Sequence, residues 1–309
     1  TKITIPNNVK EIGTSSFEGC FKLINIELPN SINIIESSSF SGCKSIKQII
    51  IPSSVKNIEE YSFNDCTSLQ EININPYITN IHNKTFNKCT KLQHLILSST
   101  ITKTQRYQFI PFEYLTKITI PNNVKEIGTS SFEGCSKIIN IYLPNSINII
   151  ESSSFSGCSS LKEIYIPSSV QYIKSNAFAN CISIINIEIP STVIQIGKSC
   201  FSGCSSMKTI ILSKSIQTIE NNLFEGCSSL KEINIPTSVK EIKSYSFSGC
   251  KSIKQIIIPP SVKNIEEYSF NDCTSLQEIN INPYITNIHN KSFNKCTKLQ
   301  HLILSSTIT

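Results

Sequence analysis

The chain repeats one apolar pattern every 23 residues from end to end. Counting in steps of 23 from Ile3, every position as far as Leu302 is Ile or Leu, and the same steps from Phe17 to Phe293 meet only Phe. Seven apolar or cysteine positions stay in phase over the 309 residues, with exceptions only in the fifth unit. A short unit repeated without insertion is typical of a solenoid, in which each unit forms one coil. The sequence therefore predicts about thirteen coils of 23 residues.

Each unit contains a strand, a return segment and a turn. In the unit that begins at Ile49, Ile49 and Ile51 flank a variable position, which is the alternation of a strand with one buried face. Proline usually follows and ends the strand, because it has no N–H for the sheet. Val55 and Ile58 then return along the opposite wall of the coil. A Ser-rich stretch such as SSSFSGC at 37–43 leads to the Phe and Cys positions, and we predict a short helical turn capped by Ser there.

One such unit cannot bury seven apolar side chains by itself, so the units must stack. Stacking in register turns each apolar position into a ladder along the axis of the solenoid. The strands of successive coils then lie beside one another as a parallel sheet. The phenylalanine ladder is expected to be a major part of the core, because each fully buried Phe contributes about 1.5–3 kcal/mol.

The repeat unit resembles a known family. Units such as IIIPSSVKNIEEYSFNDCTSLQE (49–71) and INIPTSVKEIKSYSFSGCKSIKQ (233–255) follow a consensus I-x-I-P-x-S-V-x-x-I-x-x-x-x-F-x-G-C-x-x-L-x-x. This consensus resembles the BspA-like, or Treponema pallidum-type, leucine-rich repeat. The resemblance implies a leucine-rich-repeat solenoid: a curved right-handed superhelix of about thirteen coils, with a parallel sheet on the concave face and short strands and helical turns on the convex side.

The resemblance also implies a biological setting. Family members occur on bacterial surfaces and in parasitic protists such as Entamoeba and Trichomonas, where adhesion and cell-surface recognition are suggested roles. The wealth of Ile, Asn and Lys, beside a single Arg and no Trp, indicates an A/T-rich genome and favours a protist. Membership implies a cell-surface or secreted protein, whereas the many free thiols expected here fit a reducing cytoplasm, and both remain open.

A longer similarity lies over the short repeat. Residues 1–102 look like a shortened copy of 116–309, and the whole of 1–309 is expected to form one continuous solenoid. The linking segment 103–115, KTQRYQFIPFEYL, completes the fifth coil but breaks its pattern. It contains the irregular side chains Arg106, Tyr107 and Tyr114, and no polar capping unit stands at either end. We expect the natural chain to continue at one or both ends.

The residue types give no indication of catalysis or of a cofactor. Twelve of the thirteen cysteines occupy the same position of the 23-residue unit, from which only the fifth unit departs, with Phe112. This interval suits a ladder of buried free thiols and not the short spacings of a zinc site. Cys200 and Cys204 form a lone C-x-x-x-C with no histidine nearby. Neither a phosphate-binding loop nor a catalytic pattern around the four histidines is present. We predict a protein that is not an enzyme and has no metal, cofactor, catalytic or cofactor-binding residues.

Charge and hydropathy limit the partners. The net charge of +6 comes almost wholly from Lys, whereas nucleic-acid binders show a clustered basic face rich in Arg. The sequence also lacks the run of about 18 apolar residues that a transmembrane helix needs. We therefore expect no nucleic-acid partner and no transmembrane segment in this chain.

The candidate binding residues are those that point outward from the predicted sheet. Tyr142 and Tyr165 fall on adjacent strands, and tyrosine is enriched in protein interfaces. The alternative is an aromatic cross-strand pair that only stabilises the sheet. Exposed isoleucines at 50, 96, 211 and 257 would make the same face suitable for protein contact. The residues expected to contact a partner are Tyr142, Tyr165, Glu163, Glu188, His94 and Lys117.

Two functions remain open at this stage. The first is a repeat module that binds a protein or glycan partner through its concave face, in cell-surface adhesion or recognition. The alternative is a structural or intracellular scaffold that self-associates end to end through its uncapped repeats.

Overall fold

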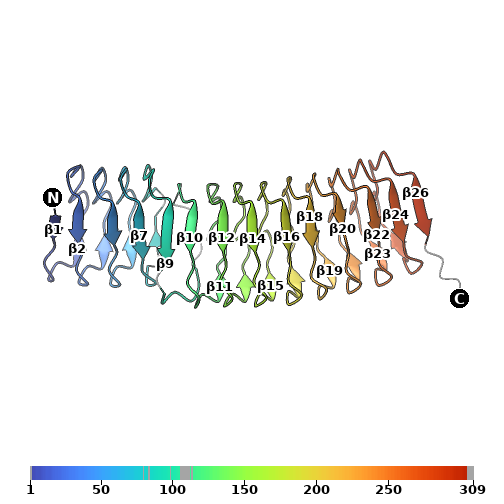
Figure 1. Cartoon of the computed structure of the whole chain (residues 1–309), viewed down its shortest axis with the longest axis horizontal. Helices are drawn as coiled ribbons and strands as arrows, with labels where there is room; N and C mark the ends of the chain where they lie inside the picture. Colours follow the sequence, from blue (N-terminus) through green and yellow to red (C-terminus); the bar gives the residue numbers. More distant parts are fainter. Residues whose placement is uncertain are drawn as a thin grey trace.

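The computed structural model is a solenoid whose coils stack along one axis, from β1 at one end to β26 at the other (Figure 1). It describes residues 2–78, 80–82, 84–97, 99–104, 112 and 114–304. Each regular coil contributes one strand to each of two faces. The prediction of a solenoid built on parallel strands is confirmed.

We call the first face the long-strand face, because most of its strands contain three or four residues. Its strands are β1 (Lys2–Thr4), β3 (Asn25–Glu27), β5 (Gln48–Ile50), β7 (Glu71–Ile74), β9 (His94–Leu97), β10 (Lys117–Thr119), β12 (Asn140–Tyr142), β14 (Glu163–Tyr165), β16 (Asn186–Glu188), β18 (Thr209–Ile211), β20 (Glu232–Ile233), β22 (Gln255–Ile257), β24 (Glu278–Ile281) and β26 (His301–Leu304).

The second face is the short-strand face, whose strands contain two residues each. They are β2 (Glu11–Ile12), β4 (Ile34–Ile35), β6 (Asn57–Ile58), β8 (Asn80–Ile81), β11 (Glu126–Ile127), β13 (Ile149–Ile150), β15 (Tyr172–Ile173), β17 (Gln195–Ile196), β19 (Thr218–Ile219), β21 (Glu241–Ile242), β23 (Asn264–Ile265) and β25 (Asn287–Ile288).

The sequence period sets the strand register on both faces. Ile49 pairs with Ile72, 23 residues on, and all paired strands in the described ranges are parallel. Ile49 and Ile51 are buried, whereas Ile50 between them is 65% exposed. This alternation follows from the pleat, which points successive side chains to opposite sides of a strand. The long-strand face therefore displays one exposed column between two buried ones.

The core contains the predicted ladder of phenylalanines. Phe132, Phe155 and Phe178 are fully buried, with ring centroids 5.1 and 5.3 Å apart and rings nearly parallel. This spacing is slightly larger than the 4.7–4.9 Å typical between neighbouring strands. Each ring thus packs on the same residue of the next coil.

The cysteines line the core as free thiols. All thirteen are free, and most are buried. The Cys181 Sγ donates a hydrogen bond to the carbonyl oxygen of Phe155 in the previous coil at 3.1 Å, and Cys204 bonds to Phe178 in the same way at 3.2 Å. Burial raises the pKa of the Cys204 thiol to about 12. These thiols therefore stay neutral and act as small buried groups.

The prediction of short helical turns is wrong, because the Ser-rich stretches form non-helical turns in the described part of the chain. In the 37–43 turn, Ser38 adopts a left-handed backbone with φ of 54°. The Ser38 and Phe40 N–H groups donate to the carbonyls of Glu60 and Ser62 in the next coil. An α-helix would instead need these N–H groups to bond within their own segment. Stacking between coils therefore overrides the local preference of serine for a helix cap.

The fifth coil departs from the regular pattern on the short-strand face. On this face, the described residues of the fifth coil form no strand. They form only an isolated bridge from Lys103 to Glu126, whose side chains also form an ion pair. The Thr104 hydroxyl accepts a hydrogen bond from the Gly128 N–H at 2.8 Å and donates to the Ser131 hydroxyl at 3.1 Å. A polar cluster thus replaces the isoleucine that other coils bury here.

The ring of Phe112 in this coil stacks on Phe86, at a centroid distance of 4.6 Å. The 23-residue count predicts Phe109 for the ladder position of the same coil. Phe109 lies outside the described residues, as do Arg106 and Tyr107. Tyr114, the third irregular side chain, is half-buried.

Candidate interaction surface

Two tyrosines stand side by side at the middle of the long-strand face. Tyr142 on β12 pairs in register with Tyr165 on β14, and their side chains are 76% and 67% exposed. Neither takes part in any of the stacked ring pairs found among the described residues, such as the ladder of core phenylalanines. Both phenol groups therefore point away from the core and are accessible to a partner.

Acidic side chains lie next to these tyrosines. Glu163 precedes Tyr165 by two positions on β14, so its side chain leaves the sheet on the same side, and it is exposed. Glu188 ends β16, which lies beside β14, and it is exposed too. Two carboxylates thus lie near the tyrosine pair, one on the same strand as Tyr165 and one on the following strand.

The two remaining predicted residues lie on the N-terminal side of the same surface. His94 on β9 is the register partner of Lys117 on β10. The His94 Nε2 lies 3.0 Å from the hydroxyl of Thr119, which is the register neighbour of Tyr142. The structure therefore brings all six predicted residues onto five neighbouring strands, β9 to β16, of one face. We call this set the tyrosine surface.

A second group on the long-strand face was missed at the sequence level. Lys231 and Lys254 line a shallow pocket of about 870 Å³ together with Ile211 and Ile257, whose side chains are exposed. Lys208 occupies the same position one coil earlier. The signal was present, since three lysines follow one another at the 23-residue interval, but lysine on a repeat surface is too common to stand out.

The described residues contain no group of three or more His, Cys, Asp or Glu side chains placed to hold a metal ion. The same ranges contain no helix with the length and apolar character needed to cross a membrane.

The fold can be compared with known proteins. The family model described as "BspA type Leucine rich repeat region (6 copies)" matches residues 1–112, 79–208 and 194–309, which together span the whole chain. The chain belongs to the BspA type leucine rich repeat family. Its origin in a protist stays a prediction.

Solved structures agree with this membership. A leucine-rich repeat protein from Bacteroides ovatus is 29% identical to this BspA-type chain, with a TM-score of 0.66, and the match covers 98% of this chain and 78% of that one. One from Eubacterium ventriosum is 19% identical, with a TM-score of 0.54 and a coverage of 100% and 84%, and supports the fold alone. The comparison with curated proteins finds no match.

Proposed function

We propose that this repeat region is a recognition module that binds a protein partner through the tyrosine surface. The observation that carries the proposal is the pair Tyr142 and Tyr165, in register on adjacent strands and largely exposed. Exposed aromatic side chains on a rigid sheet lose little conformational entropy on binding, and tyrosine is enriched among residues that dominate interface energies. The sheet keeps the two phenol groups in a fixed arrangement before a partner arrives.

The surroundings of the pair favour a protein over a glycan. Exposed Ile50, Ile211 and Ile257 stand in the same outward column as the tyrosines, and aliphatic groups gain most from burial against apolar protein surface. Glu163 and Glu188 would guide a partner with basic residues to this end of the surface. The same proposal includes a role in cell-surface adhesion and holds that the protein binds a partner and does not catalyse a reaction. Membership of the leucine rich repeat family supports both parts.

The proposal is tested with a double variant and a matched control. Tyr142→Ala/Tyr165→Ala removes the pair, and Tyr77→Ala/Tyr284→Ala removes two tyrosines that are also exposed but lie outside the strands. Each variant is measured for binding to an array of cell-surface and matrix proteins and to a glycan array. We expect saturable binding to a protein that weakens about 30-fold or more in the first variant, as for loss of a hot spot of about 2 kcal/mol, and not in the control.

Two results would overturn this function. Equal binding by both double variants would remove the tyrosine surface from the interaction. Binding to glycans only, with the same dependence on the tyrosines, would replace the protein partner by a sugar. Light scattering across a range of protein concentrations distinguishes the recognition module from the alternative of a self-associating scaffold. End-to-end association makes the mean particle mass rise with protein concentration, whereas a recognition module stays monomeric.

A further inference from the structure

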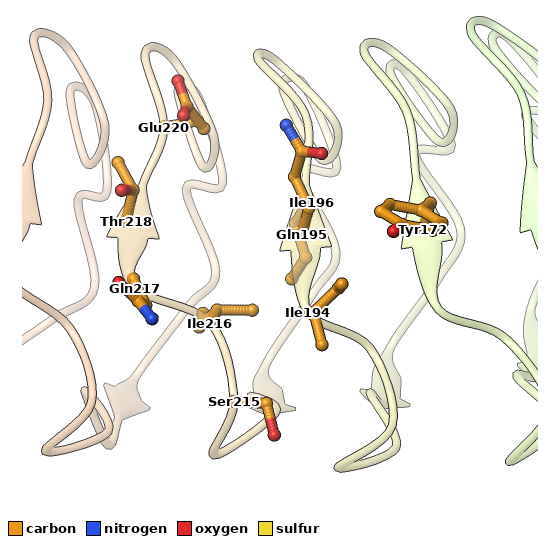
Figure 2. Close-up of a pocket in the computed structure, with 9 residues that line it drawn as sticks. All are labelled: Tyr172, Ile194, Gln195, Ile196, Ser215, Ile216, Gln217, Thr218 and Glu220. Atoms are coloured by element: carbon orange, nitrogen blue, oxygen red, sulfur yellow. The ribbon is translucent and has the colours of Figure 1, made fainter.

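The sheet of the short-strand face is interrupted between β17 and β19. One set of paired strands runs from β11 to β17 and the next from β19 to β25, and no pairing joins the two sets. On the opposite side of these two coils the chain stays closely packed, since β16 pairs in register with β18. The coils therefore separate only on the short-strand face, and they form a wedge there (Figure 2).

The interruption leaves main-chain groups without their usual partners. At the next boundary, the Lys240 N–H donates to the Gln217 carbonyl at 2.8 Å and the Lys243 N–H donates to the Ile219 carbonyl at 2.9 Å. The equivalent donors one coil earlier are the Gln217 and Glu220 N–H groups. Neither has a backbone hydrogen bond to the preceding coil in the described structure. An open strand edge of this kind is a template for another extended chain.

Two residues distinguish this boundary from the next one, where Pro236 and Glu220 occupy the equivalent positions. Ser213 stands where most coils have proline, and its hydroxyl bonds to the Val193 carbonyl at 2.6 Å. The turn bond that other coils form at this place, such as Val239 N–H to the Pro236 carbonyl at 3.0 Å, has no counterpart from Ile216 to Ser213. The altered turn changes how the chain enters β19.

Gly197 acts from the other side of the gap. A Cβ atom on Gly197 would lie 2.4 Å from the backbone nitrogen of Ser175, so only glycine permits this close approach to the preceding coil. The chain just after β17 therefore lies close to the coil that contains β15, where the Gly197 N–H donates to the Ile173 carbonyl at 2.8 Å.

The wedge combines apolar and polar walls. It has a volume of about 450 Å³, within the range of ligand pockets, and is lined by Tyr172, Ile194, Gln195, Ile216, Gln217 and Glu220 among others (Figure 2). Ile194 is 49% exposed at a position that holds polar or lysine residues in the other coils. Gln195 and Gln217 bring amide groups of the kind that pair with peptide main chain.

A carboxylate at the upper end of the wedge forms no ion pair with its neighbours in the described structure. Glu220 is half-buried and forms no ion pair in the described structure. Its neighbour in the preceding coil is Gly197, which has no side chain. Its neighbour in the following coil, Lys243, is held by Glu241 and Glu266 at 2.8 and 3.3 Å. A basic group on a ligand would complement this charge.

We propose that the β17–β19 wedge binds an extended peptide segment of a partner protein, which pairs its main chain with the open strand edges. A basic side chain of the peptide reaches Glu220, and an aliphatic side chain packs on Ile194 and Tyr172. This site is on the face opposite the tyrosine surface, so it does not depend on the function proposed above.

The first experiment examines the open edge without any ligand. Amide hydrogen exchange is measured on the intact chain at Gln217 and Glu220 and at their hydrogen-bonded equivalents, Lys240 and Lys243. We expect the first two amides to exchange at least about tenfold faster than the second two, because they lack a backbone partner. Equal protection at all four sites would mean a closed sheet and would overturn the proposal.

The second experiment selects ligands from a display library of short random peptides, using the wild-type chain and the Ile194→Lys/Glu220→Lys variant as separate baits. Lysine occurs naturally at the position of Ile194 in other coils, as in Lys125, so the variant is expected to fold. We expect peptides with a basic and an aliphatic residue to be enriched on the wild-type chain alone. Failure to enrich peptides, or equal enrichment on both baits, would overturn the proposal.

A synthetic copy of a selected peptide then tests how it binds. N-methylation of its main chain should weaken binding about tenfold or more, and Glu220→Gln should do the same by removing a charged hydrogen bond. Glu151→Gln, at the equivalent position where β13 is paired on both sides, is the matched control and should bind normally. Unchanged affinity of the N-methylated peptide would exclude strand pairing and overturn the proposal.

Discussion

Replacement of Phe155 by alanine tests whether the phenylalanine ladder stabilises the solenoid as the packing indicates. Phe155 is fully buried, and its ring stacks on Phe132 at 5.1 Å and on Phe178 at 5.3 Å. Burial of a Phe side chain contributes about 1.5–3 kcal/mol, and the cavity left behind raises the usual cost of Phe→Ala to about 3–5 kcal/mol. Loss of two ring contacts, each worth about 0.5–1.5 kcal/mol, places Phe155→Ala near the upper end of that range.

The matched variant is Phe17→Ala in the first coil. Phe17 is only partly buried and stacks on one ring, that of Phe40, at 5.2 Å. With less buried area and one ring contact, we expect a smaller cost, of about 2–3 kcal/mol. The comparison keeps the residue type and its position in the repeat unit constant, and it changes the number of stacked neighbours and the burial that they provide.

The assay is urea unfolding followed by far-ultraviolet circular dichroism. Coils of a repeat protein interact only with their neighbours, so a defect at Phe155 can also split the transition into two halves. Either a lower midpoint with unchanged slope or a split transition agrees with the argument. A loss of stability in Phe155→Ala no larger than in Phe17→Ala would refute the view that stacking between coils carries the core.

Three further predictions concern backbone packing and the thiols. Gly128→Ala should lower the free energy of unfolding by about 2–4 kcal/mol, because its Cβ would lie 2.0 Å from the backbone oxygen of Thr104. The control is Gly13→Ala, in an identical sequence segment, whose Cβ meets only the Ser16 hydroxyl at 3.3 Å. It should cost less than about 0.5 kcal/mol in the same urea titration. Burial raises the pKa of the Cys204 thiol to about 12, above the ordinary value of about 8.5, so its stabilising effect is complete below about pH 8.5 and is lost as the pH rises toward 12. Thermal unfolding should therefore show falling stability from about pH 9 upward and a shallower fall in Cys204→Ala; equal slopes would contradict this. Alkylation of the native chain near neutral pH, read by mass spectrometry, should label Cys20, which is exposed, before any buried thiol.

The sequence predicts the fold in detail at positions where every coil needs the same kind of side chain, buried or exposed. Ile49, Ile51 and Phe155 are buried because each unit places an apolar residue at the same point of the same pleat. Outward residues could be predicted for the same reason, and Tyr142 and Tyr165 are exposed on adjacent strands as expected. Their role in binding stays a prediction, since exposure alone does not identify a partner.

The turns could not be predicted, because their shape depends on the neighbouring coil. Tyr61 adopts a left-handed backbone with φ of 58°, a conformation that bulky side chains usually avoid. Hydrogen bonds between coils impose this geometry on whichever residue occupies the position, including Ser38.

The wedge between β17 and β19 could not be predicted from the sequence, for a different reason. Gly197 and Ser213 look like ordinary substitutions at variable positions of the repeat unit. Loss of the proline at the position of Ser213 does not by itself separate the strands, because the coil with Asn282 at that position keeps its strands paired. Both changes meet at the β17–β19 boundary, where the strand pairing is interrupted while Ile196 and Ile219 stay buried. A repeat consensus describes the side chains that coils share, so it contains no signal for a missing hydrogen bond between two particular coils.

This contrast leads to a test of whether the solenoid has one binding surface or two. The tyrosine surface uses side chains on the long-strand face, whereas the wedge uses main-chain groups on the opposite face. Sites that share no contacts have additive effects on free energy, within about 0.5 kcal/mol. Combining Tyr142→Ala/Tyr165→Ala with Glu220→Gln should therefore leave each variant's effect on its own ligand unchanged. If the wedge variant weakens binding of the protein partner as well, a single ligand wraps around the edge of the coils, and the two surfaces are parts of one site.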